Sequence, residues 1–218
     1  MSLRTAEAIA SILRDDDRSE LQALCGEHVR FDEPLAPYTS WKIGGPADAF
    51  ISVPTSEMLA GILRFTCART MPWFVLGSGS NILIGDGGIR GLVLRLAGDF
   101  TEIAFEDDAA DTVVVHAGAS AAMSLLTAQA ASRGAKGIGS LAGIPGSVGG
   151  SLRMNAGTDR ETGDFVRAVW VQTPSKPAAH AVDVRYYYRH TSLTRDAIVA
   201  RVTFAFERGL SLIHISEP

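Results

Sequence analysis

The sequence is poor in cysteine and contains no long apolar run, and each shortage excludes a class of protein. Its 218 residues include two cysteines, Cys25 and Cys67, which are far apart in the chain. Two separated thiols fit the reduced state of a cytoplasmic protein rather than a disulfide framework. We therefore expect a cytoplasmic protein whose thiols are small buried hydrophobic side chains. The longest apolar stretches are far shorter than the roughly 20 residues of a membrane-spanning helix, so we expect no membrane association.

Clustered basic residues and metal-binding motifs are absent as well. The formal net charge is −4, with 20 lysines and arginines against 24 aspartates and glutamates, and a nucleic-acid partner is therefore disfavoured. The five histidines are scattered and no His-Glu-x-x-His pattern occurs, so we expect no metal site. The N-terminus carries no basic segment followed by an apolar one, so we expect no signal peptide. We expect a monomer whose partner is a small molecule.

The chain does contain enough apolar sequence for a full hydrophobic core. Its composition, 46% hydrophobic and 20% charged, excludes global disorder. Hydrophobic periodicity and helix-capping residues predict the secondary structure. The predicted helices cover residues 5–25 (broken near 15–17), 56–69 and 120–133 (closed by Gly134), and the predicted strands cover residues 48–53, 73–76, 92–96, 100–105, 112–116, 166–172 and 198–206. This order predicts a mixed α+β fold with two sub-lobes.

Two glycine-dense segments are the most informative feature of the chain. Residues 77–91 and 134–157 hold 14 of the 22 glycines. Glycine lets a backbone adopt positive φ and lets a ligand approach bare peptide N–H groups. Successive N–H groups turned inward bind an anion without lysine or arginine. We therefore expect residues 77–81 and 143–150 to contact a diphosphate-containing ligand from two sides.

Common glycine motifs do not account for either segment. A nucleoside-triphosphate P-loop would end in Gly-Lys-Ser or Gly-Lys-Thr, and neither triplet occurs. Residues 137–142 match the Rossmann fingerprint formally, but they follow a predicted helix rather than a strand. Residues 77–81 follow a predicted strand, yet an isoleucine stands where the third small residue belongs. For residues 86–88, Asp-Gly-Gly, a tight turn is the simpler interpretation.

A third segment, residues 185–192, combines two arginines with three tyrosines. The fixed fork of donors on arginine suits a carboxylate or a phosphate, and tyrosine rings could stack on a flat ligand. An edge strand with a surface cation–π pair fits the same spacing equally well. From the residues alone, both interpretations stay open.

Four motifs occur in an order that resembles one flavoprotein family. They are Thr39-Ser-Trp-Lys-Ile-Gly-Gly-Pro-Ala-Asp48, Leu76-Gly-Ser-Gly-Ser-Asn-Ile-Leu83, Ala142-Gly-Ile-Pro-Gly-Ser-Val-Gly-Gly150 with Met154-Asn-Ala-Gly157, and Tyr188-Arg-His-Thr-Ser192. Over residues 38–208 the chain resembles the UDP-N-acetylenolpyruvoylglucosamine reductases (UDP-N-acetylmuramate dehydrogenases) of bacterial cell-wall synthesis. Each motif alone is moderate support for this resemblance, and four in the same order are strong support.

The resemblance implies a fold of the vanillyl-alcohol-oxidase (PCMH) type, in which two α+β subdomains hold FAD between them. It implies a helical lead-in over residues 1–37, an FAD-binding domain over 38–208 with subdomains of about 38–98 and 99–208, and an atypical tail over 209–218. Carried over by residue, the FAD-binding positions are Gly77, Ser78, Gly79, Ser80, Asn81 and Ile82 in the first lobe and Ile144, Pro145, Gly146, Ser147, Gly150 and Tyr188 in the second. Arg189 matches the family's catalytic arginine, which holds and polarises the enolpyruvyl carboxylate.

The implied activity is the reduction of UDP-N-acetylglucosamine enolpyruvate to UDP-N-acetylmuramate, with FAD bound and NADPH as co-substrate. In the family a third domain binds substrate and supplies a proton-donating serine and a glutamate. This sequence departs from that pattern after residue 208, so we expect it to carry the FAD-binding part and to lack turnover by itself. Two alternatives remain. One is another FAD-dependent oxidase or dehydrogenase of the same fold, and the other is a non-catalytic nucleotide-binding fragment.

Overall fold

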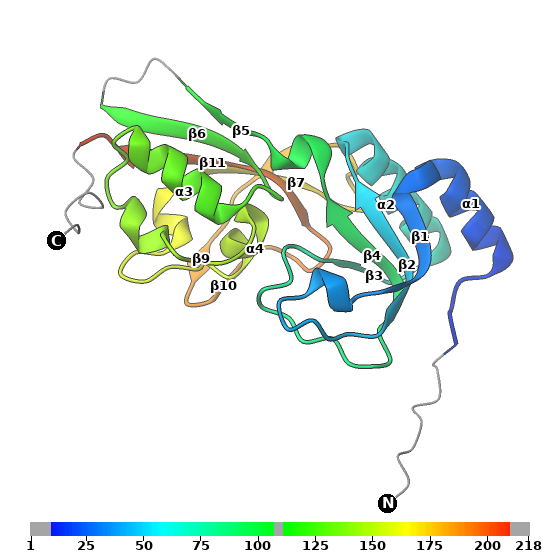
Figure 1. The fold of residues 1–218 in the computed structure, drawn as a ribbon. Helices are drawn as coiled ribbons and strands as arrows, with labels where there is room; N and C mark the ends of the chain where they lie inside the picture. Colours follow the sequence, from blue (N-terminus) through cyan, green and yellow to red (C-terminus); the bar gives the residue numbers. More distant parts are fainter. Residues whose placement is uncertain (1–9, 107–110, 210–218) are drawn as a thin grey trace, which may run out of the picture.

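The fold consists of two lobes, each built around one β-sheet (Figure 1). The structure is a computed structural model that describes residues 10–106 and 111–209. The first sheet has the strand order β1 (Val29–Pro34), β2 (Pro46–Val53), β4 (Ile89–Leu96) and β3 (Trp73–Val75). Helices α1 (Asp15–Cys25) and α2 (Ser56–Arg69) cover one face of it. The opposite face is open to the loops that carry the first glycine segment.

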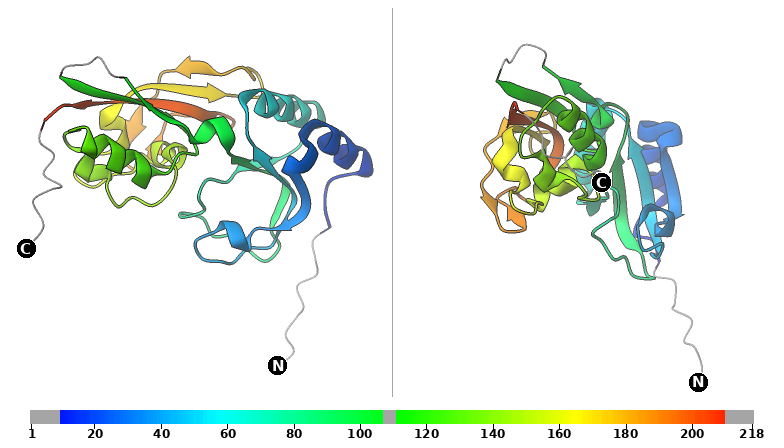
Figure 2. Two further views of the ribbon diagram at one scale, coloured as in Figure 1. Left: turned by 45° about the horizontal axis from the view of Figure 1, so that its top comes forward. Right: turned by 60° about the vertical axis from the view of Figure 1, so that its left-hand side comes forward.

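The second lobe contains an antiparallel sheet with two helices packed on one side (Figure 2). Its strand order is β5 (Ile103–Phe105), β6 (Thr112–Gly118), β11 (Ile198–Glu207), β7 (Val166–Gln172) and β8 (His180–Val182), and its helices are α3 (Met123–Ser132) and α4 (Val148–Arg153). A separate hairpin joins β9 (Tyr186–Tyr187) to β10 (His190–Thr191). Short 3₁₀ helices cover Gly26–His28, Ala36–Tyr38, Gly98–Thr101, Ile138–Leu141 and Thr162–Phe165.

Strand direction in the first sheet determines where its loops lie. Strand β2 pairs with β4, and β4 with β3, in parallel, whereas β1 is antiparallel to β2. The carboxyl ends of β2, β3 and β4 therefore share one edge of the sheet, and the first glycine segment begins there. A small apolar cluster holds this segment against the sheet face opposite the helices; it consists of Leu35, Ala47, Phe50, Leu76, Ile84 and Val93.

The two lobes share one main hydrophobic core and several polar links. Leu94 of β4 and Phe204 of β11 are both fully buried members of this core. Ser120 Oγ donates a hydrogen bond to the carbonyl of Leu96, at 2.6 Å. The Gln172 amide accepts from Ser56 Oγ at 2.9 Å and donates to the Ser56 carbonyl at 3.0 Å. These contacts place the end of β4 directly beside the segment that precedes α3.

Most of the predicted elements are confirmed. Strands predicted over 48–53, 73–76, 92–96, 112–116, 166–172 and 198–206 correspond to β2, β3, β4, β6, β7 and β11, and the helix predicted over 56–69 is α2. The hairpin predicted over 100–116 exists as β5 and β6, although Phe100 lies in a 3₁₀ helix. Gly134 follows α3 with a φ of 79°, in the left-handed region typical of a residue after a helix.

Two helix starts and one cysteine differ from the predictions. The first helix begins at Asp15, because the Asp17 carboxylate accepts a hydrogen bond from the backbone N–H of Arg14 and fixes the start there; predicted residues 5–9 lie outside the described ranges. The helix predicted from Ser120 begins at Met123, since the Ser120 hydroxyl donates a hydrogen bond to the Leu96 carbonyl of β4.

Of the two cysteines predicted to be buried, only one is. Cys25 is buried, and burial raises the pKa of its thiol to about 11. Cys67 is exposed on α2.

The N-terminal helix is attached to α2 through a buried carboxylate. Asp17 is 1% exposed, and its side chain pairs with the guanidinium groups of Arg14 and Arg69. Burial acts to raise the pKa of Asp17, but the hydrogen bond from the Arg14 backbone and the charges of Arg14 and Arg69 outweigh it, so the pKa of Asp17 is lowered from its ordinary value. The ionised form of Asp17 therefore stabilises the fold.

We predict that Asp17→Asn lowers thermal stability at neutral pH and flattens the pH dependence in acid. A carboxyl with a lowered folded-state pKa contributes stability above its unfolded pKa of about 3.9, and this contribution is lost as pH falls through the lower folded value. Melting temperatures measured between pH 7 and pH 2 should differ most near neutrality and converge in acid. The neighbouring exposed Asp16→Asn is the matched control; equal effects of the two substitutions would contradict the prediction.

Candidate functional site

The first glycine loop lies against the segment that precedes β2. Gly79 has a φ of 69°, and a Cβ at this position would overlap the carbonyl oxygen of Tyr38. The Gly79 carbonyl accepts a hydrogen bond from the backbone N–H of Ser40 at 3.0 Å. Only glycine allows both this backbone conformation and this approach. The loop is therefore attached to the preceding segment through the carbonyl of Gly79.

The backbone N–H groups of the same loop have no protein acceptor in the described part of the chain. Within the described ranges, no backbone N–H from residue 77 to residue 84 donates to another protein group. Buried or partly buried backbone donors are normally paired, so such a run marks a place where water or a ligand accepts the hydrogen bonds. Its start at the carboxyl ends of parallel strands is the usual location of ligands in sheets of this kind.

The second glycine loop meets the first across the junction of the lobes. Ser80 Oγ donates to the carbonyl of Pro145 at 3.3 Å. A Cβ at Gly146, whose φ is 129°, would lie 3.2 Å from Ser80 Oγ, and a Cβ at Gly77 would lie 2.9 Å from Ser147 Oγ. Glycine at these two positions keeps the space between the loops free of side chains.

Helix α3 and helix α4 hold the second loop in place. The Gly146 carbonyl accepts from the backbone N–H of Met123 at 3.0 Å, at the start of α3. Ser147 caps α4, because its side chain accepts from the backbone N–H of Gly150 at 3.4 Å. The described part of the chain gives no protein acceptor to the backbone N–H groups of Gly143, Gly146 and Ser147. Both loops thus present free donors.

The remaining residues predicted for this site are placed less centrally. Ile82 packs against the small apolar cluster of the first lobe, and Ile144 packs against the main core. Asn81 is exposed in the turn of the first loop. Tyr188 is 78% exposed at the tip of the β9–β10 hairpin. The structure therefore brings the glycines and serines of the two loops together and leaves Tyr188 on a separate projection.

Arg189 occupies a strained position beside Tyr188. It is the second residue of the two-residue turn between β9 and β10, and its φ is 59°. Its guanidinium donates to the carbonyls of Gly157 at 3.1 Å and Asn155 at 3.4 Å, and lies 4.8 Å from the Tyr188 ring centroid. For residues 185–192, the structure shows a short hairpin with a cation–π pair and a partly exposed Arg189, and the ligand-binding interpretation stays a prediction.

Asn155 is a positioning residue to which the sequence assigned no role. It is 1% exposed, and its amide nitrogen donates to the Tyr187 carbonyl at 3.0 Å and to the Glu161 carboxylate. Its amide oxygen accepts from the backbone N–H of Gly163 at 2.9 Å. This one side chain thus ties the end of α4, the 161–163 turn and the hairpin of Arg189 together. In the sequence, the one indication of a role for Asn155 is its position in the motif Met154-Asn-Ala-Gly157.

Other kinds of site find no support in the described residues. Within residues 10–106 and 111–209, no helix is both long and apolar enough to cross a membrane. The same ranges contain no group of three or more His, Cys, Asp or Glu side chains placed to hold a metal ion. The arrangement is instead one of neutral backbone donors between two lobes, with Arg189 on a separate hairpin.

Comparisons with known proteins agree with this geometry. The chain is 37% identical over 194 residues to a UDP-N-acetylenolpyruvoylglucosamine reductase of Myxococcus xanthus, covering 88% of this chain and 62% of that protein. The crystal structure of the corresponding reductase from Thermus caldophilus matches with a TM-score of 0.67 and 34% identity, over 84% of this chain and 63% of that one. The chain thus spans about three fifths of the length of the relatives it matches.

More distant structures share the fold alone. A VAO-type flavoprotein from Myceliophthora thermophila C1 superimposes with a TM-score of 0.63 at 14% identity, over 95% of this chain and 49% of that one. The α+β arrangement of two lobes is therefore the FAD-binding fold of the VAO type, as predicted. The sequence profile of the FAD binding domain matches residues 47–175, which include both glycine loops. Because this match covers more than half of the 218 residues, the chain belongs to the FAD binding domain family.

Proposed function

We propose that the chain binds FAD between its two lobes, with the diphosphate against the backbone of Gly77–Asn81 and Pro145–Ser147. The observation that carries this proposal is the pair of facing loops in which the backbone N–H groups of residues 77–84 and of Gly143, Gly146 and Ser147 have no protein acceptor within the described ranges. A diphosphate offers several anionic oxygens to such donors. Family membership supports FAD as the dinucleotide.

The residues present fit this cofactor. A Cβ at Gly77 or at Gly146 would occupy the space between the loops, where the nearest atoms are hydroxyls of Ser147, Ser78 and Ser80. A cradle of glycines rimmed by serine hydroxyls accommodates an anionic chain and adds neutral donors to it. When bound, FAD supplies the hydride-transfer chemistry of an oxidoreductase.

We further propose that the whole protein reduces UDP-N-acetylglucosamine enolpyruvate with NADPH, as a cytoplasmic step of peptidoglycan synthesis. The names of the relatives at 33–40% identity support this assignment. In this proposal residues 38–208 form the FAD-binding domain, divided near residue 98. A third domain beyond residue 208 would supply the proton-donating serine and the glutamate, and residues 210–218 of the proposed atypical tail lie outside the described ranges.

Arg189 is the residue of this chain that we assign to the substrate carboxylate. The carbonyls of Asn155 and Gly157 hold two of its guanidinium nitrogens, and Glu161 lies 3.8 Å away, so the side chain is oriented before any substrate arrives. A preoriented guanidinium stabilises negative charge that develops next to a carboxylate. The Tyr188 ring lies against one face of the guanidinium, with its centroid 4.8 Å from the central carbon.

Gly77→Ala should weaken FAD binding about tenfold or more, because its methyl group would enter the space between the loops, 2.9 Å from Ser147 Oγ. A tenfold change corresponds to about 1.4 kcal/mol, within the usual effect of overpacking. Fluorescence titration of the ligand-free chain with FAD measures the change. Gly85→Ala is the matched control, since a Cβ there would contact nothing within 4 Å and its φ is not positive. Equal affinities of the two variants would contradict the proposed position of the diphosphate.

We predict that the 218-residue chain retains FAD but does not turn over substrate. Flavin absorbance should co-elute with the protein in gel filtration. Addition of NADPH and the enolpyruvyl substrate should yield no UDP-N-acetylmuramate, while the full-length Myxococcus xanthus relative serves as the positive control. A colourless protein in the presence of excess FAD would contradict FAD binding, and measurable product would show that the chain contains a complete catalytic set.

Arg189→Lys should weaken the binding of the enolpyruvyl substrate about tenfold while leaving FAD affinity unchanged. Lysine keeps the charge but loses the planar fork, and a charge-assisted pair of hydrogen bonds has about this value. The change in flavin absorbance during titration of the FAD-loaded whole protein, which includes the proposed third domain, with substrate gives the affinity. Arg185→Lys, at an exposed position of the same segment, is the control and should behave like the parent. If both variants bind substrate equally, Arg189 does not contact the carboxylate.

A further inference from the structure

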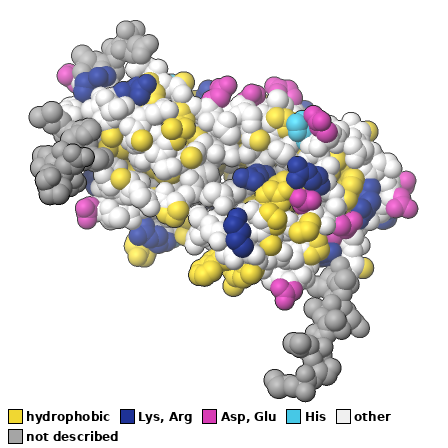
Figure 3. All heavy atoms as spheres, viewed as in Figure 1, with side chains coloured by type: hydrophobic (Ala, Val, Ile, Leu, Met, Phe, Trp, Pro, Cys, Tyr) yellow, Lys and Arg dark blue, Asp and Glu magenta, His cyan; other side chains and the backbone are white. Residues whose placement is uncertain are grey.

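The hairpin that carries Arg189 has little backbone support of its own. Its strands pair through two residues each, Tyr186 with Thr191 and Tyr187 with His190. Among the described residues these strands form a sheet apart from the two larger ones. A two-stranded hairpin is marginally stable in water, so side chains must hold this one. Where it lies in Figure 1, Figure 3 shows basic and hydrophobic side chains together at the surface.

The turn at the tip of this hairpin belongs to a class that hairpins disfavour. Arg189, its second central residue, has a φ of 59°, whereas Tyr188, the first, does not have a positive φ. Two-residue hairpin turns favour types I′ and II′, and both require a positive φ at the first central residue. A positive φ at the second alone is the pattern of a type II turn, which splays the strands. The backbone by itself therefore does not favour the conformation that presents Arg189.

One face of the hairpin is anchored to the second lobe. The Tyr186 ring packs on Gly163, where a Cβ would lie 2.4 Å from Tyr186 Cγ. Burial of this ring raises the pKa of Tyr186 to about 12. The Tyr187 carbonyl accepts a hydrogen bond from the buried Asn155 amide at 3.0 Å. Both contacts lie on β9, before the turn begins.

His190 contacts the turn from the opposite face. Successive side chains of a strand alternate between faces, so Tyr187 points away from the anchored side. The His190 ring stacks on the Tyr187 ring, with centroids 4.6 Å apart and an angle of 10° between the planes. Its Nδ1 lies 3.3 Å from the Tyr188 carbonyl oxygen; because a carbonyl can only accept, Nδ1 is the donor in this contact. One imidazole therefore contacts both residues that precede Arg189 in the chain.

We propose that His190 is a positioning residue for Arg189. Its stack on Tyr187 and its hydrogen bond hold the turn in the conformation in which the Arg189 guanidinium reaches the carbonyls of Asn155 and Gly157. An aromatic pair and a hydrogen bond together are of the same order as the cost of a left-handed non-glycine residue. This inference rests on the proposed function, in which Arg189 binds the substrate carboxylate, and it adds a residue that acts through Arg189.

Modification of Arg189 by phenylglyoxal, followed by mass spectrometry, tests the positioning without FAD or substrate. His190→Ala removes both contacts and should raise the rate of Arg189 modification about fivefold, which corresponds to about 1 kcal/mol. The rate is normalised to that of the exposed Arg64. His180→Ala is the matched control, because Nδ1 of His180 on β8 likewise contacts a carbonyl two residues earlier, that of Ala178, at 3.0 Å. This control should leave the Arg189 rate unchanged.

Two further substitutions isolate the ring stack. His190→Phe keeps a ring over Tyr187 and should recover most of the protection. Tyr187→Ala removes the partner ring and should raise the Arg189 rate, and combining it with His190→Ala should add little because both remove the same stack. Tyr187→Ala carries the test if His190→Ala does not fold. An Arg189 rate equal to the parental one in both alanine variants would overturn the proposal.

Substrate binding to the FAD-loaded whole protein gives a readout that a merely structural role would not move. His190→Ala should weaken binding of the enolpyruvyl substrate about fivefold and leave FAD affinity unchanged. In an Arg189→Lys background it should have no further effect, because no guanidinium is left to position. A loss of the same size in both backgrounds would overturn the positioning role. If the parent does not bind the substrate while the phenylglyoxal results hold, the proposed function fails and the positioning of Arg189 by His190 stands.

Discussion

The site depends on the close approach of glycine backbone to neighbouring atoms, at points where a side chain would not fit. Gly79 packs on the carbonyl of Tyr38, and Gly146 faces the hydroxyls of Ser78 and Ser80 across the junction of the lobes. Within the described ranges, the backbone N–H groups of residues 77–84 and of Gly143, Gly146 and Ser147 have no protein acceptor, so they are available to a ligand. The distance between the loops, which Ser80 and the Pro145 carbonyl bridge, limits the size of the group that can lie there.

The two sheets contribute to this arrangement in different ways. In the first lobe, parallel pairing brings the ends of β2, β3 and β4 to one edge, from which the first loop starts. In the second lobe, an antiparallel sheet supports α3 and α4, and these two helices carry the second loop between them. The bonds of Ser56 with Gln172 and of Ser120 with Leu96 fix the lobes to each other. Neither lobe alone presents both sets of donors.

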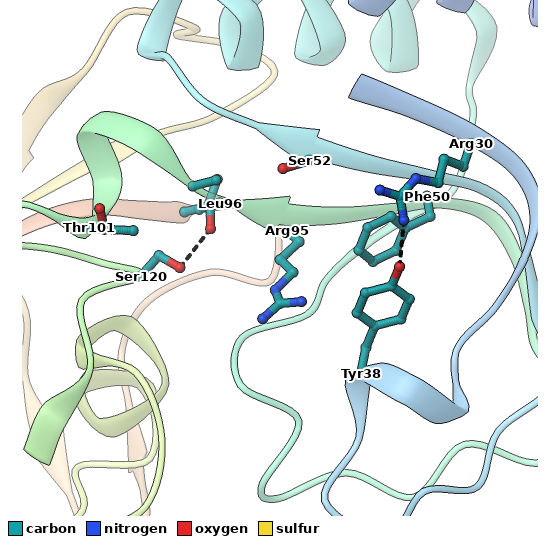
Figure 4. Close-up of a pocket in the computed structure, with 9 residues that line it drawn as sticks. Arg30, Tyr38, Phe50, Ser52, Arg95, Leu96, Thr101 and Ser120 are labelled. Atoms are coloured by element: carbon teal, nitrogen blue, oxygen red, sulfur yellow. Dashed lines mark hydrogen bonds between the residues drawn. The ribbon is translucent and has the colours of Figure 1, made fainter. Parts of the chain in front are cut away.

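Features that depend on a short stretch of sequence could be predicted, whereas groups of side chains that strand order brings together could not. Glycine density is a local signal, so the sequence predicts where both loops lie, and the role of Arg189 stays a prediction from motif resemblance. Arg30, Phe50 and Arg95 line one pocket on the first sheet (Figure 4) although they come from three strands, and only the order β1-β2-β4 and a register that pairs Ser52 with Arg95 bring them together. The three hydrogen bonds of Asn155 join segments up to 32 residues apart in the chain, which composition and periodicity do not reveal.

Arg189 illustrates a conflict between stability and side-chain chemistry. A non-glycine residue in the left-handed region costs about 1–2 kcal/mol relative to ordinary backbone conformations, and Arg189 has a φ of 59°. Selection for thermostability alone would favour glycine or asparagine at this turn. Directed evolution toward a more heat-resistant chain would therefore tend to remove this guanidinium. A screen that counts only surviving folded protein would enrich variants that have lost the group proposed to bind a carboxylate.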